Sequence, residues 1–276
     1  MKANWILEED VFDENIEEFK KEINNQGMSY DLVNLKDFQS HNYNLFPGYS
    51  CVIFYGSLRF MRRLLREKNW IPCGWCTLAN FECFKYYTYW GKHLFNQDYI
   101  MIPLQELIRR KEYIFENFGE DNKIFVRPSS GYKEFDGEVI SLDGLNESML
   151  SFVSEDSPEL LVVVSSPKKI DREWRFVVTD TEVITGSMYK DNGSVEMELS
   201  KEGSPEWDYV RRLVEGAVWH PDKTYTMDVC ESNGKKYLLE LNAFSTSGFY
   251  DCDLKKIIST ASEMAVTEHH DFIFAS

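Results

Sequence analysis

Three oxygen-bearing side chains near the end of the chain have the types and spacing of a site for a hard cation. They lie in the segment 225–242, where Asp228 is followed, after a gap of eleven residues, by Glu240 and Asn242 in a Glu-x-Asn pair. In an extended strand, alternation places Glu240 and Asn242 on one face and the apolar side chains around them on the other. Mg²⁺ is held by one or two carboxylates, and substrate phosphates complete its coordination shell. The segment therefore predicts a metal site; the alternative is the solvated polar face of an antiparallel sheet.

The turn between the two arms of this segment decides whether the three side chains can meet. A two-residue loop at 233–234 is the usual turn for the dipeptide Asn-Gly, but it would place Asp228 on the face opposite Glu240. A shared metal needs a loop with an odd number of residues. We therefore expect a three-residue loop over 232–234, which ends in a left-handed glycine and pairs Asp228 with Leu238.

A second hairpin carries basic side chains that suit an anionic substrate. Its arms are the segments 173–178 and 182–190, and an even loop at Asp180-Thr181 pairs Arg175 with Gly186. That register places four side chains on one face, which are Glu173, Arg175, Met188 and Lys190. Two cations beside a carboxylate suit a polyphosphate and the charge that develops on an acyl phosphate. The alternative is an ordinary salt-bridge ladder on the surface.

Further cations flank a polar loop earlier in the chain. Arg127 lies near the end of the apolar strand expected at 123–128, and Lys133 lies inside the loop 129–137, which contains two glycines. A cation on a strand followed by a mobile polar loop can hold and cover phosphates. A plain hairpin turn with exposed charges is the alternative.

Cys73, Cys76 and Cys83 form a CGWC motif followed by a third thiol. A zinc site would need a fourth ligand, for which His93 is the close candidate, and a redox pair is a second option. We favour reduced, semi-buried thiols, because six cysteines in 276 residues do not make a disulfide scaffold.

The elements that must position these residues follow from hydrophobic periodicity and turn residues. We expect helices over 8–25, 58–69, 103–118, 146–153, 204–220 and 251–266, with Ser57 and Ser204 as N-caps. Besides the two hairpins, we expect strands at 29–35, 51–56, 123–128, 138–141 and 159–166. The segment 191–203 is expected to be a polar loop.

The order of these features is more specific than any one of them. It runs from a strand with a cation, through a flexible loop, an apolar strand and an E-x-R hairpin with a basic residue, to the final Asp and Glu-x-Asn. This order resembles the ATP-grasp superfamily over about residues 95–265, through the segments FVRPSSGYKEFDGEVIS, REWRFVV, MYK, YTMDV and LLELN. Arg127 in place of the usual lysine, together with the short chain, is similar to a divergent, phage-associated clade.

The resemblance implies a mixed α+β and α/β architecture. The expected ATP-grasp fold has two α+β subdomains that clasp a nucleotide, and a small α/β pre-ATP-grasp domain precedes it. The corresponding division is 1–95 for the preceding domain, 96–164 for the N-terminal subdomain and 165–276 for the C-terminal subdomain with the metal-binding hairpin.

The resemblance also implies a role for each matching residue, with ATP and Mg²⁺ as cofactors. The expected Mg²⁺ ligands are Asp228, Glu240 and Asn242, with Glu240 bridging two ions. Basic residues are expected at the phosphates, with Arg127 at the α/β-phosphates, Lys133 in the covering loop, and Arg175 and Lys190 near the γ-phosphate and the acyl phosphate. The remaining nucleotide contacts are expected from Glu173 and from four hinge residues, Val163, Val164, Ser165 and Ser166.

The activity implied is that of a Mg–ATP-dependent carboxylate–amine ligase that forms an amide through an acyl phosphate. A phosphotransferase on the same fold and a non-catalytic nucleotide-binding module are the alternatives. The expected partners are small-molecule or peptide carboxylates and amines, and the oligomeric state is left open. A net charge of −16 argues against nucleic acid as a partner, and the sequence has no apolar run long enough for a membrane span. The acidic N-terminus without an apolar core segment predicts a cytoplasmic protein.

Overall fold

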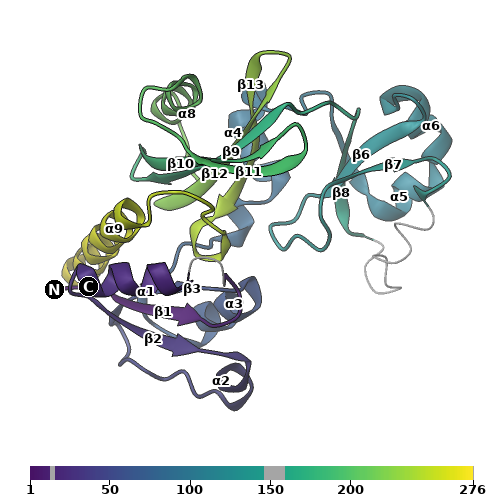
Figure 1. The fold of residues 1–276 in the computed structure, drawn as a ribbon. Coiled ribbons are helices and arrows are strands. Elements are labelled where there is room, and N and C mark those ends of the chain that lie inside the picture. The colour runs from purple at the N-terminus through teal and green to yellow at the C-terminus, as the bar shows by residue number, and fades with distance from the viewer. Residues whose placement is uncertain (13–15, 146–158, 276) are drawn as a thin grey trace. The chain divides into compact units, whose positions relative to one another are not determined.

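The computed structural model describes residues 1–12, 16–145 and 159–275 (Figure 1). Its strands form three sheets, two of four strands and one of five. The chain divides into two compact units, one made of residues 1–77, 172–229 and 240–276 and the other of residues 78–171 and 230–239. The division predicted at residues 95 and 164 stays a prediction. The helix expected over 146–153 lies outside the described residues.

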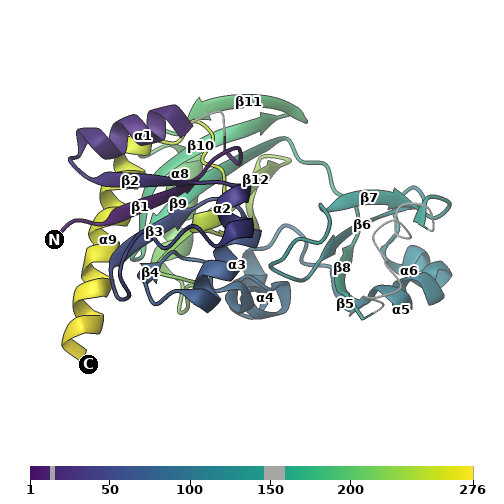
Figure 2. The same cartoon turned by 90° about the horizontal axis from the view of Figure 1, so that it is seen from below.

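The first unit begins with a parallel sheet in the order β2-β1-β3-β4 (Figure 2). Its strands are β1 (Asn4–Glu8), β2 (Ser29–Val33), β3 (Cys51–Tyr55) and β4 (Ile71–Cys73), and its helices are α1 (Ile16–Asn25), α2 (Leu35–Ser40) and α3 (Leu58–Glu67). Ser57 caps α3 as predicted, because its side chain accepts a hydrogen bond from the Phe60 amide. The helix predicted over 8–25 is shorter, because the chain up to Glu8 is a strand in the interior of the sheet.

The second unit contains an antiparallel sheet in the order β5-β8-β6-β7. Its strands are β5 (Ile100–Pro103), β6 (Lys123–Pro128), β7 (Glu138–Ser141) and β8 (Leu161–Ser165), and its helices are α4 (Cys83–Trp90), α5 (Leu104–Arg109) and α6 (Lys111–Phe118). The three strands predicted here, β6, β7 and β8, are confirmed. The single helix predicted over 103–118 is wrong, because the backbone leaves the helical region at Arg110.

The five-stranded sheet has the order β11-β10-β9-β12-β13. Its strands are β9 (Arg172–Thr179), β10 (Glu182–Asp191), β11 (Ser194–Leu199), β12 (Thr224–Ser232) and β13 (Lys235–Ala243). The two predicted hairpins are therefore confirmed as elements. The polar loop expected over 191–203 contains β11 instead. Its sequence SVEMEL alternates apolar residues with glutamates, which is the period-two pattern of a strand.

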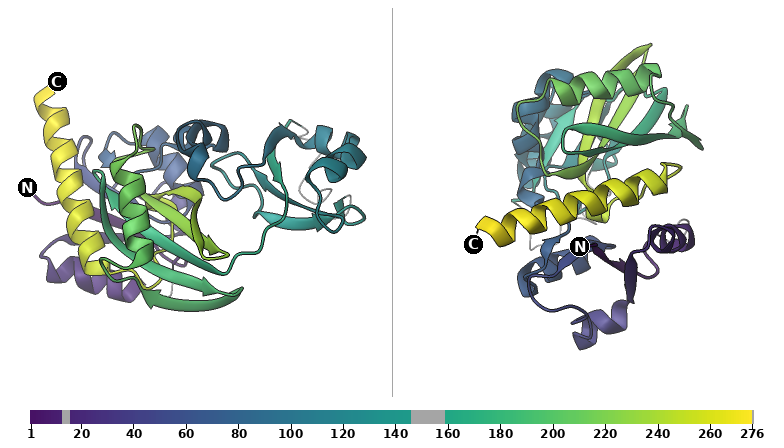
Figure 3. Two further views of the ribbon diagram at one scale, coloured as in Figure 1. Left: turned by 90° about the horizontal axis from the view of Figure 1, so that it is seen from above. Right: turned by 90° about the vertical axis from the view of Figure 1, so that its left-hand side faces the viewer.

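Two helices pack on this sheet. α8 (Pro205–Glu215) begins at the predicted cap Ser204, and its Trp207 ring lies 5.9 Å from the Phe176 ring of β9. α9 (Leu254–Ala275) runs past its predicted end at 266 and lies between the five-stranded sheet and the parallel sheet of the same unit (Figure 3). Among the described residues, no helix has both the length and the apolar composition that crossing a bilayer requires.

Candidate functional site

The hairpin β12–β13 closes with a tighter turn than predicted. β12 ends at Ser232 and β13 begins at Lys235, so Asn233 and Gly234 alone form the loop. Both residues have left-handed backbones, with φ of 51° and 72°. A type I′ turn requires positive φ at both positions, its twist matches the flanking strands, and Asn-Gly adopts it readily. The predicted three-residue loop is therefore wrong.

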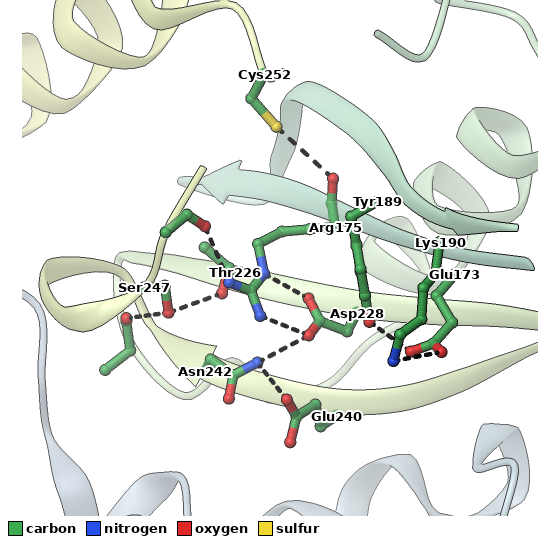
Figure 4. Close-up of polar contacts among 12 residues, drawn as sticks. Glu173, Arg175, Tyr189, Lys190, Thr226, Asp228, Glu240, Asn242, Ser247 and Cys252 are labelled. Carbon is green, nitrogen blue, oxygen red and sulfur yellow. Dashed lines mark hydrogen bonds and ion pairs between the residues drawn. The ribbon is translucent and has the colours of Figure 1, made fainter. Parts of the chain in front are cut away.

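The three oxygen-bearing side chains of this hairpin nevertheless meet (Figure 4). Asn242 Nδ2 donates hydrogen bonds to Asp228 Oδ2 at 3.3 Å and to Glu240 Oε1 at 3.1 Å. Uninterrupted pairing from a two-residue turn would have pointed Asp228 away from Asn242. We infer a one-residue bulge in the strand pair between the turn and the site. The leucines of β13 agree with it, because Leu238 and Leu241 are both buried although they are three residues apart.

A buried ion pair joins the two hairpins. Arg175 Nε and Nη2 each donate to one oxygen of Asp228, both at 2.7 Å, and Nη1 donates to the carbonyl oxygen of Gly248 at 2.9 Å. Arg175 is 8% exposed and Asp228 is 1% exposed. Burial by itself lowers the pKa of Arg175, but the Asp228 carboxylate outweighs burial and holds that pKa above its ordinary value. The guanidinium group is therefore charged and largely committed to Asp228.

The hairpin β9–β10 closes with the predicted turn but not with the predicted register. The loop is Asp180-Thr181, and both residues have left-handed backbones. An irregularity at Ile184 then shifts the pairing by one residue, so Arg175 lies opposite Ser187 instead of Gly186. A bulge needs no particular residue types around it. The sequence pattern therefore did not reveal this one-residue shift in the register.

A second irregularity, at Tyr189, places Lys190 opposite Glu173. Of the four side chains predicted on one face, Glu173, Arg175 and Lys190 share it, whereas Met188 lies on the opposite face. Lys190 Nζ lies 3.5 Å from Glu173 Oε1, and the Tyr189 hydroxyl donates to Glu173 Oε2 at 2.8 Å. The Lys190 side chain is 42% exposed, so its ammonium group keeps donors that can reach an anion in solvent.

An aromatic pair beside the buried ion pair was not predicted. The Arg175 guanidinium carbon lies 5.1 Å from the centre of the Tyr250 ring, which stacks on the Tyr189 ring at 4.6 Å. Burial is the main cause that raises the pKa of both tyrosines, so both hydroxyls are neutral at neutral pH. Tyr250 has a left-handed backbone, with φ of 50°, in the irregular segment after β13. No periodic pattern in the sequence marked it.

The other predicted nucleotide residues lie in the second unit. Arg127 of β6 lies opposite Val163 of β8, and Lys133 is exposed in the loop after β6. Val163 and Val164 are fully buried and pair with strands on both sides, so the sheet already uses their backbone groups. Ser165 is the last residue of β8, and Ser166 lies beyond the strand.

An acidic side chain reaches the end of the predicted hinge from just before β5. Asp98 accepts hydrogen bonds from the Ser166 amide, at 3.3 Å, and from the Lys168 ammonium group. Burial alone raises the pKa of Asp98, but these hydrogen bonds outweigh burial and lower it. The hinge segment itself contains no carboxylate, and Ser166 lies 68 positions after Asp98 in the sequence. Only the folded pairing of β5 with β8 brings them together.

The donor set at the β12–β13 hairpin fits a magnesium ion. Asn242 Oδ1 is buried and has no hydrogen-bond partner within the described part of the chain. Asn242 turns Nδ2 toward the two carboxylates, so a shared ion requires the amide to rotate and bring Oδ1 to them. An amide oxygen with two carboxylates is a combination of ligands that Mg²⁺ takes in proteins. In residues 1–12, 16–145 and 159–275, no three side chains of His, Cys, Asp or Glu gather as a metal site. The predicted set of Asp228, Glu240 and Asn242 is not such a group, because it contains only two carboxylates and its third member is an amide.

The cysteines have the properties of buried structural thiols. All six are buried and none forms a disulfide. Burial raises the pKa of Cys73 and of Cys76 to about 12, so both thiols are protonated at neutral pH. Because the thiolate is the form that binds metal and reacts, this environment disfavours a zinc or redox role and favours reduced thiols.

The sequence was compared with models of protein families and with the curated proteins. A sequence model of a family described as ATP-grasp domain, R2K clade family 2, matches residues 107–260, which is more than half of the chain. A search of the curated proteins found no match.

Solved structures of ligases resemble the chain over nearly its whole length. The D-alanine–D-alanine ligase from Bacillus anthracis complexed with ATP matches with a TM-score of 0.60 and 12% identity, over 98% of each chain. The D-cycloserine synthetase DcsG matches with a TM-score of 0.58 and 11% identity, over 95% of this chain and 99% of the other. The ligase PsnB with the precursor peptide PsnA2 and AMPPNP matches with a TM-score of 0.53 and 13% identity, over 97% of each chain. At these identities the likeness establishes the fold and leaves the substrates open.

Proposed function

Because this chain belongs to family 2 of the R2K clade of ATP-grasp domains, and the predicted ATP-grasp fold is thereby confirmed, we propose that it is a Mg–ATP-dependent carboxylate–amine ligase. One observation supports this most directly. Hydrogen bonds link buried Arg175, Asp228 and Asn242 to half-buried Glu240, and one amide oxygen of this array has no partner. Such an arrangement of fixed oxygen ligands suits a cation that carries phosphates.

In this proposal Asp228, Glu240 and Asn242 hold Mg²⁺. The ion supplies charge neutralisation between two anions, ATP and the substrate carboxylate. Arg175 fixes the orientation of Asp228 through two hydrogen bonds of 2.7 Å. A ligand held in this way needs no reorganisation when the ion binds, which strengthens the site.

The two cations of the β9–β10 hairpin take different parts. Lys190 is half-exposed and next to Glu173, so its ammonium group can reach the γ-phosphate and the acyl phosphate. Arg175 is buried and holds Asp228 and the Gly248 carbonyl. We therefore assign the larger share of phosphate contact to Lys190, and assign Arg175 to positioning Asp228 and to the local positive charge.

The reaction has two steps. An oxygen of the substrate carboxylate attacks the γ-phosphorus of ATP, the bond from that phosphorus to the bridging oxygen breaks, and ADP leaves. The nitrogen of an amine then attacks the acyl carbon, the carbon–oxygen bond to phosphate breaks, and the amine loses a proton as the amide forms. Catalysis comes from positioning and from charge stabilisation by Lys190 and Arg175. No side-chain nucleophile is required.

The second unit is proposed to hold the rest of the nucleotide. Arg127 would contact the α/β-phosphates, and Lys133 would close over them from the loop after β6. In the hinge 163–166, hydrogen bonds to the base are expected only from its end, because the sheet uses the backbone groups of Val163 and Val164. The proposed contacts of these two valines with the nucleotide would need local rearrangement, because both are fully buried.

The proposal does not specify which carboxylate and which amine the ligase joins. The structural neighbours include a ligase named for D-alanine and a ligase solved with a precursor peptide. Small-molecule and peptide carboxylates are therefore both within the proposal. The cytoplasmic location and the phage association stay predictions from the sequence.

An ATP-consumption screen tests the ligase proposal. ADP release is measured with amino acids, peptides and polyamines, offered singly and in pairs. We expect release that requires both a carboxylate and an amine. Glu240→Gln should lower kcat by about 100-fold or more, since one charge of the metal site is removed, with the melting temperature nearly unchanged. Glu182→Gln, at the exposed start of β10, is the matched control and should keep full activity.

Two other results would replace the proposal. A phosphorylated product that forms without any amine would identify a phosphotransferase on the same fold. ATP binding without turnover under every substrate pair, unaffected by Glu240→Gln, would identify a nucleotide-binding module.

A further inference from the structure

The two faces of the five-stranded sheet carry different chemistry. Two neighbouring rows cross β9, β10 and β11, namely Arg175, Ser187 and Leu199 in one and Trp174, Met188 and Glu198 in the next. Adjacent rows point to opposite faces of a sheet. The row of Arg175 belongs to the candidate site. The row of Trp174 lies on the face where α8 packs, so its surroundings are separate from the proposed reaction.

A cavity of about 380 Å³ lies on this second face, lined by β9, β10, β11 and the segment that leads into α8. Buried Trp174 and Met188 contribute its apolar part. Its charged lining consists of four carboxylates, Asp191, Glu196, Glu198 and Glu206, against the two cations Arg172 and Lys201. An apolar surface beside an excess of carboxylates suits the aliphatic stem and the charged end of a lysine or arginine side chain.

A buried hydroxyl group in the same lining points independently to a ligand. Ser200 is 8% exposed, and its Oγ makes no hydrogen bond within the ranges that the structure describes. A buried polar atom without a partner is destabilising. A ligand with an N–H donor would satisfy this atom, and guanidinium and ammonium groups carry such donors.

β11 is also an edge strand among the described strands, with β10 on one side. All six of its side chains are exposed, and the exposed fractions of Val195, Met197 and Leu199 are 73%, 37% and 46%. Natural edge strands are commonly protected by charged side chains, lysine above all, or by proline. SVEMEL has two glutamates but no lysine or proline. This edge therefore offers backbone donors and acceptors for one more strand.

We propose that β11 and the adjoining cavity bind an extended peptide in which basic and apolar residues alternate. The peptide pairs with the outer edge of β11, and main-chain hydrogen bonds provide affinity. Alternation sends its basic side chains to the face of Glu196 and Glu198, where one enters the cavity and donates to Ser200 Oγ. Its apolar side chains pack beside Val195 and Met197 on the other face. The cavity and the glutamates lie on the face opposite Arg175, whereas Val195 lies opposite Lys190 and shares the face of the candidate site.

A second copy of the chain is a poor occupant of this edge. Two β11 strands paired about a two-fold axis would place their glutamate rows side by side on one face. Like charges directly opposite each other in a strand pair are destabilising. The complementary positive charge must come from another sequence.

Titration of the full chain into labelled peptides tests the proposal. The probe is a fluorescein-labelled peptide of three arginines alternating with three valines. One control peptide has the same residues in two blocks, and another is the probe with N-methyl groups on alternate backbone amides. By fluorescence anisotropy at physiological salt, we expect the probe to bind at least about tenfold more tightly than either control, because only the probe combines charge with strand pairing.

Variants locate the binding on β11. The double variant Glu196→Gln with Glu198→Gln should weaken binding of the probe by about tenfold or more. Glu202→Gln, an exposed glutamate outside the cavity, should leave it unchanged. Equal binding of the three peptides, an unaffected double variant, or equal weakening by Glu202→Gln would each overturn the proposal. Circular dichroism and ATP turnover of the variants check that the fold is retained.

Discussion

The two hairpins that form the candidate site close with the same backbone turn. The residues of one turn adopt positive φ readily, and those of the other do not. In β12–β13 the loop is Asn233-Gly234, with φ of 51° and 72°, and in β9–β10 it is Asp180-Thr181, with φ of 46° and 70°. Glycine adopts positive φ without steric conflict, whereas a β-branched residue does so only against strain. Local conformational preference therefore favours the turn of β12–β13 and disfavours the turn of β9–β10.

Contacts beyond the turn explain how the strained loop persists. The Asp180 amide donates to the carbonyl oxygen of Lys223 at 2.9 Å, and the Lys223 ammonium group lies 3.3 Å from the Asp180 carboxylate. These contacts tie the loop of β9–β10 to the chain just before β12. The comparison shows that strand pairing and contacts with neighbouring segments can stabilise a turn that the local conformational preferences of its residues disfavour.

The same two hairpins also hold ion pairs of opposite character. Arg175–Asp228 is buried on both sides, whereas in Lys190–Glu173 the lysine side chain is 42% exposed. Removal of one partner from a buried pair leaves an unpaired charge in a low-dielectric environment. In an exposed pair, water solvates the charge that remains. The two pairs should therefore differ strongly in their effect on stability.

Asp228→Ala should have the largest effect on stability. It leaves the Arg175 guanidinium buried without its carboxylate, and we expect the free energy of unfolding to fall by about 3–5 kcal/mol. Urea denaturation followed by circular dichroism measures the change. The double variant Arg175→Met with Asp228→Leu removes both charges and should lose less than Asp228→Ala alone. An equal or greater loss in the double variant would show that packing, and not the unpaired charge, is the cause.

Gly234→Thr should have the next largest effect. A Cβ at this position would meet no atom within 4 Å, so the change tests the backbone alone. We expect a loss of about 1–2 kcal/mol, which is the cost of a side chain in the left-handed region. Gly234→Asn, which tolerates that region, is the control and should lose less. A negligible loss for Gly234→Thr would mean that the turn geometry changes without penalty.

The sequence predicted the membership of the site better than its geometry. Residue types and their order singled out Asp228, Glu240 and Asn242, and hydrogen bonds link the three, while their role as metal ligands stays a prediction. The predicted register was wrong in both hairpins. In β9–β10 the pairing shifts at a bulge that no residue type indicates, and in β12–β13 we infer one. In β12–β13 the expected three-residue loop offsets the strands by one residue, as the inferred bulge does, so the wrong loop length still placed Asp228 on the face of Asn242.

The missed elements and residues have related causes. The strand β11 was missed because its glutamates suggested a polar loop, although its alternation has the period of a strand. Tyr250 and Asp98 were missed because they act from irregular segments that only tertiary structure brings near Arg175 and Ser166. Local pattern thus predicts the helices and strands, while bulges and contacts across the fold decide which side chains touch.

Thr181→Gly should stabilise the protein and thereby sharpen the comparison of the turns. Relief of left-handed strain is worth about 1–2 kcal/mol, and the greater flexibility of glycine in the unfolded chain offsets about 0.5–1 kcal/mol of it. A net gain of about 0.5–1 kcal/mol should appear as a higher urea midpoint with an unchanged slope. Thr181→Val, which keeps the branched Cβ, should give no gain. Destabilisation by Thr181→Gly would show that the threonine side chain supports the hairpin.

Lys190→Ala should change stability least, by less than about 1 kcal/mol, because its ion pair with Glu173 is partly solvated. Its effect on activity should be large, with kcat lower by about 100-fold, if its ammonium group stabilises charge on the transferred phosphoryl group. Thermal denaturation and ADP release measured on the same preparation separate the two effects. Lys190→Arg keeps the charge and should retain more activity than Lys190→Ala. Loss of stability comparable to that of Asp228→Ala would mean that the half-exposed pair supports the fold as the buried pair does, and the contrast between the hairpins would then lie in their turns alone.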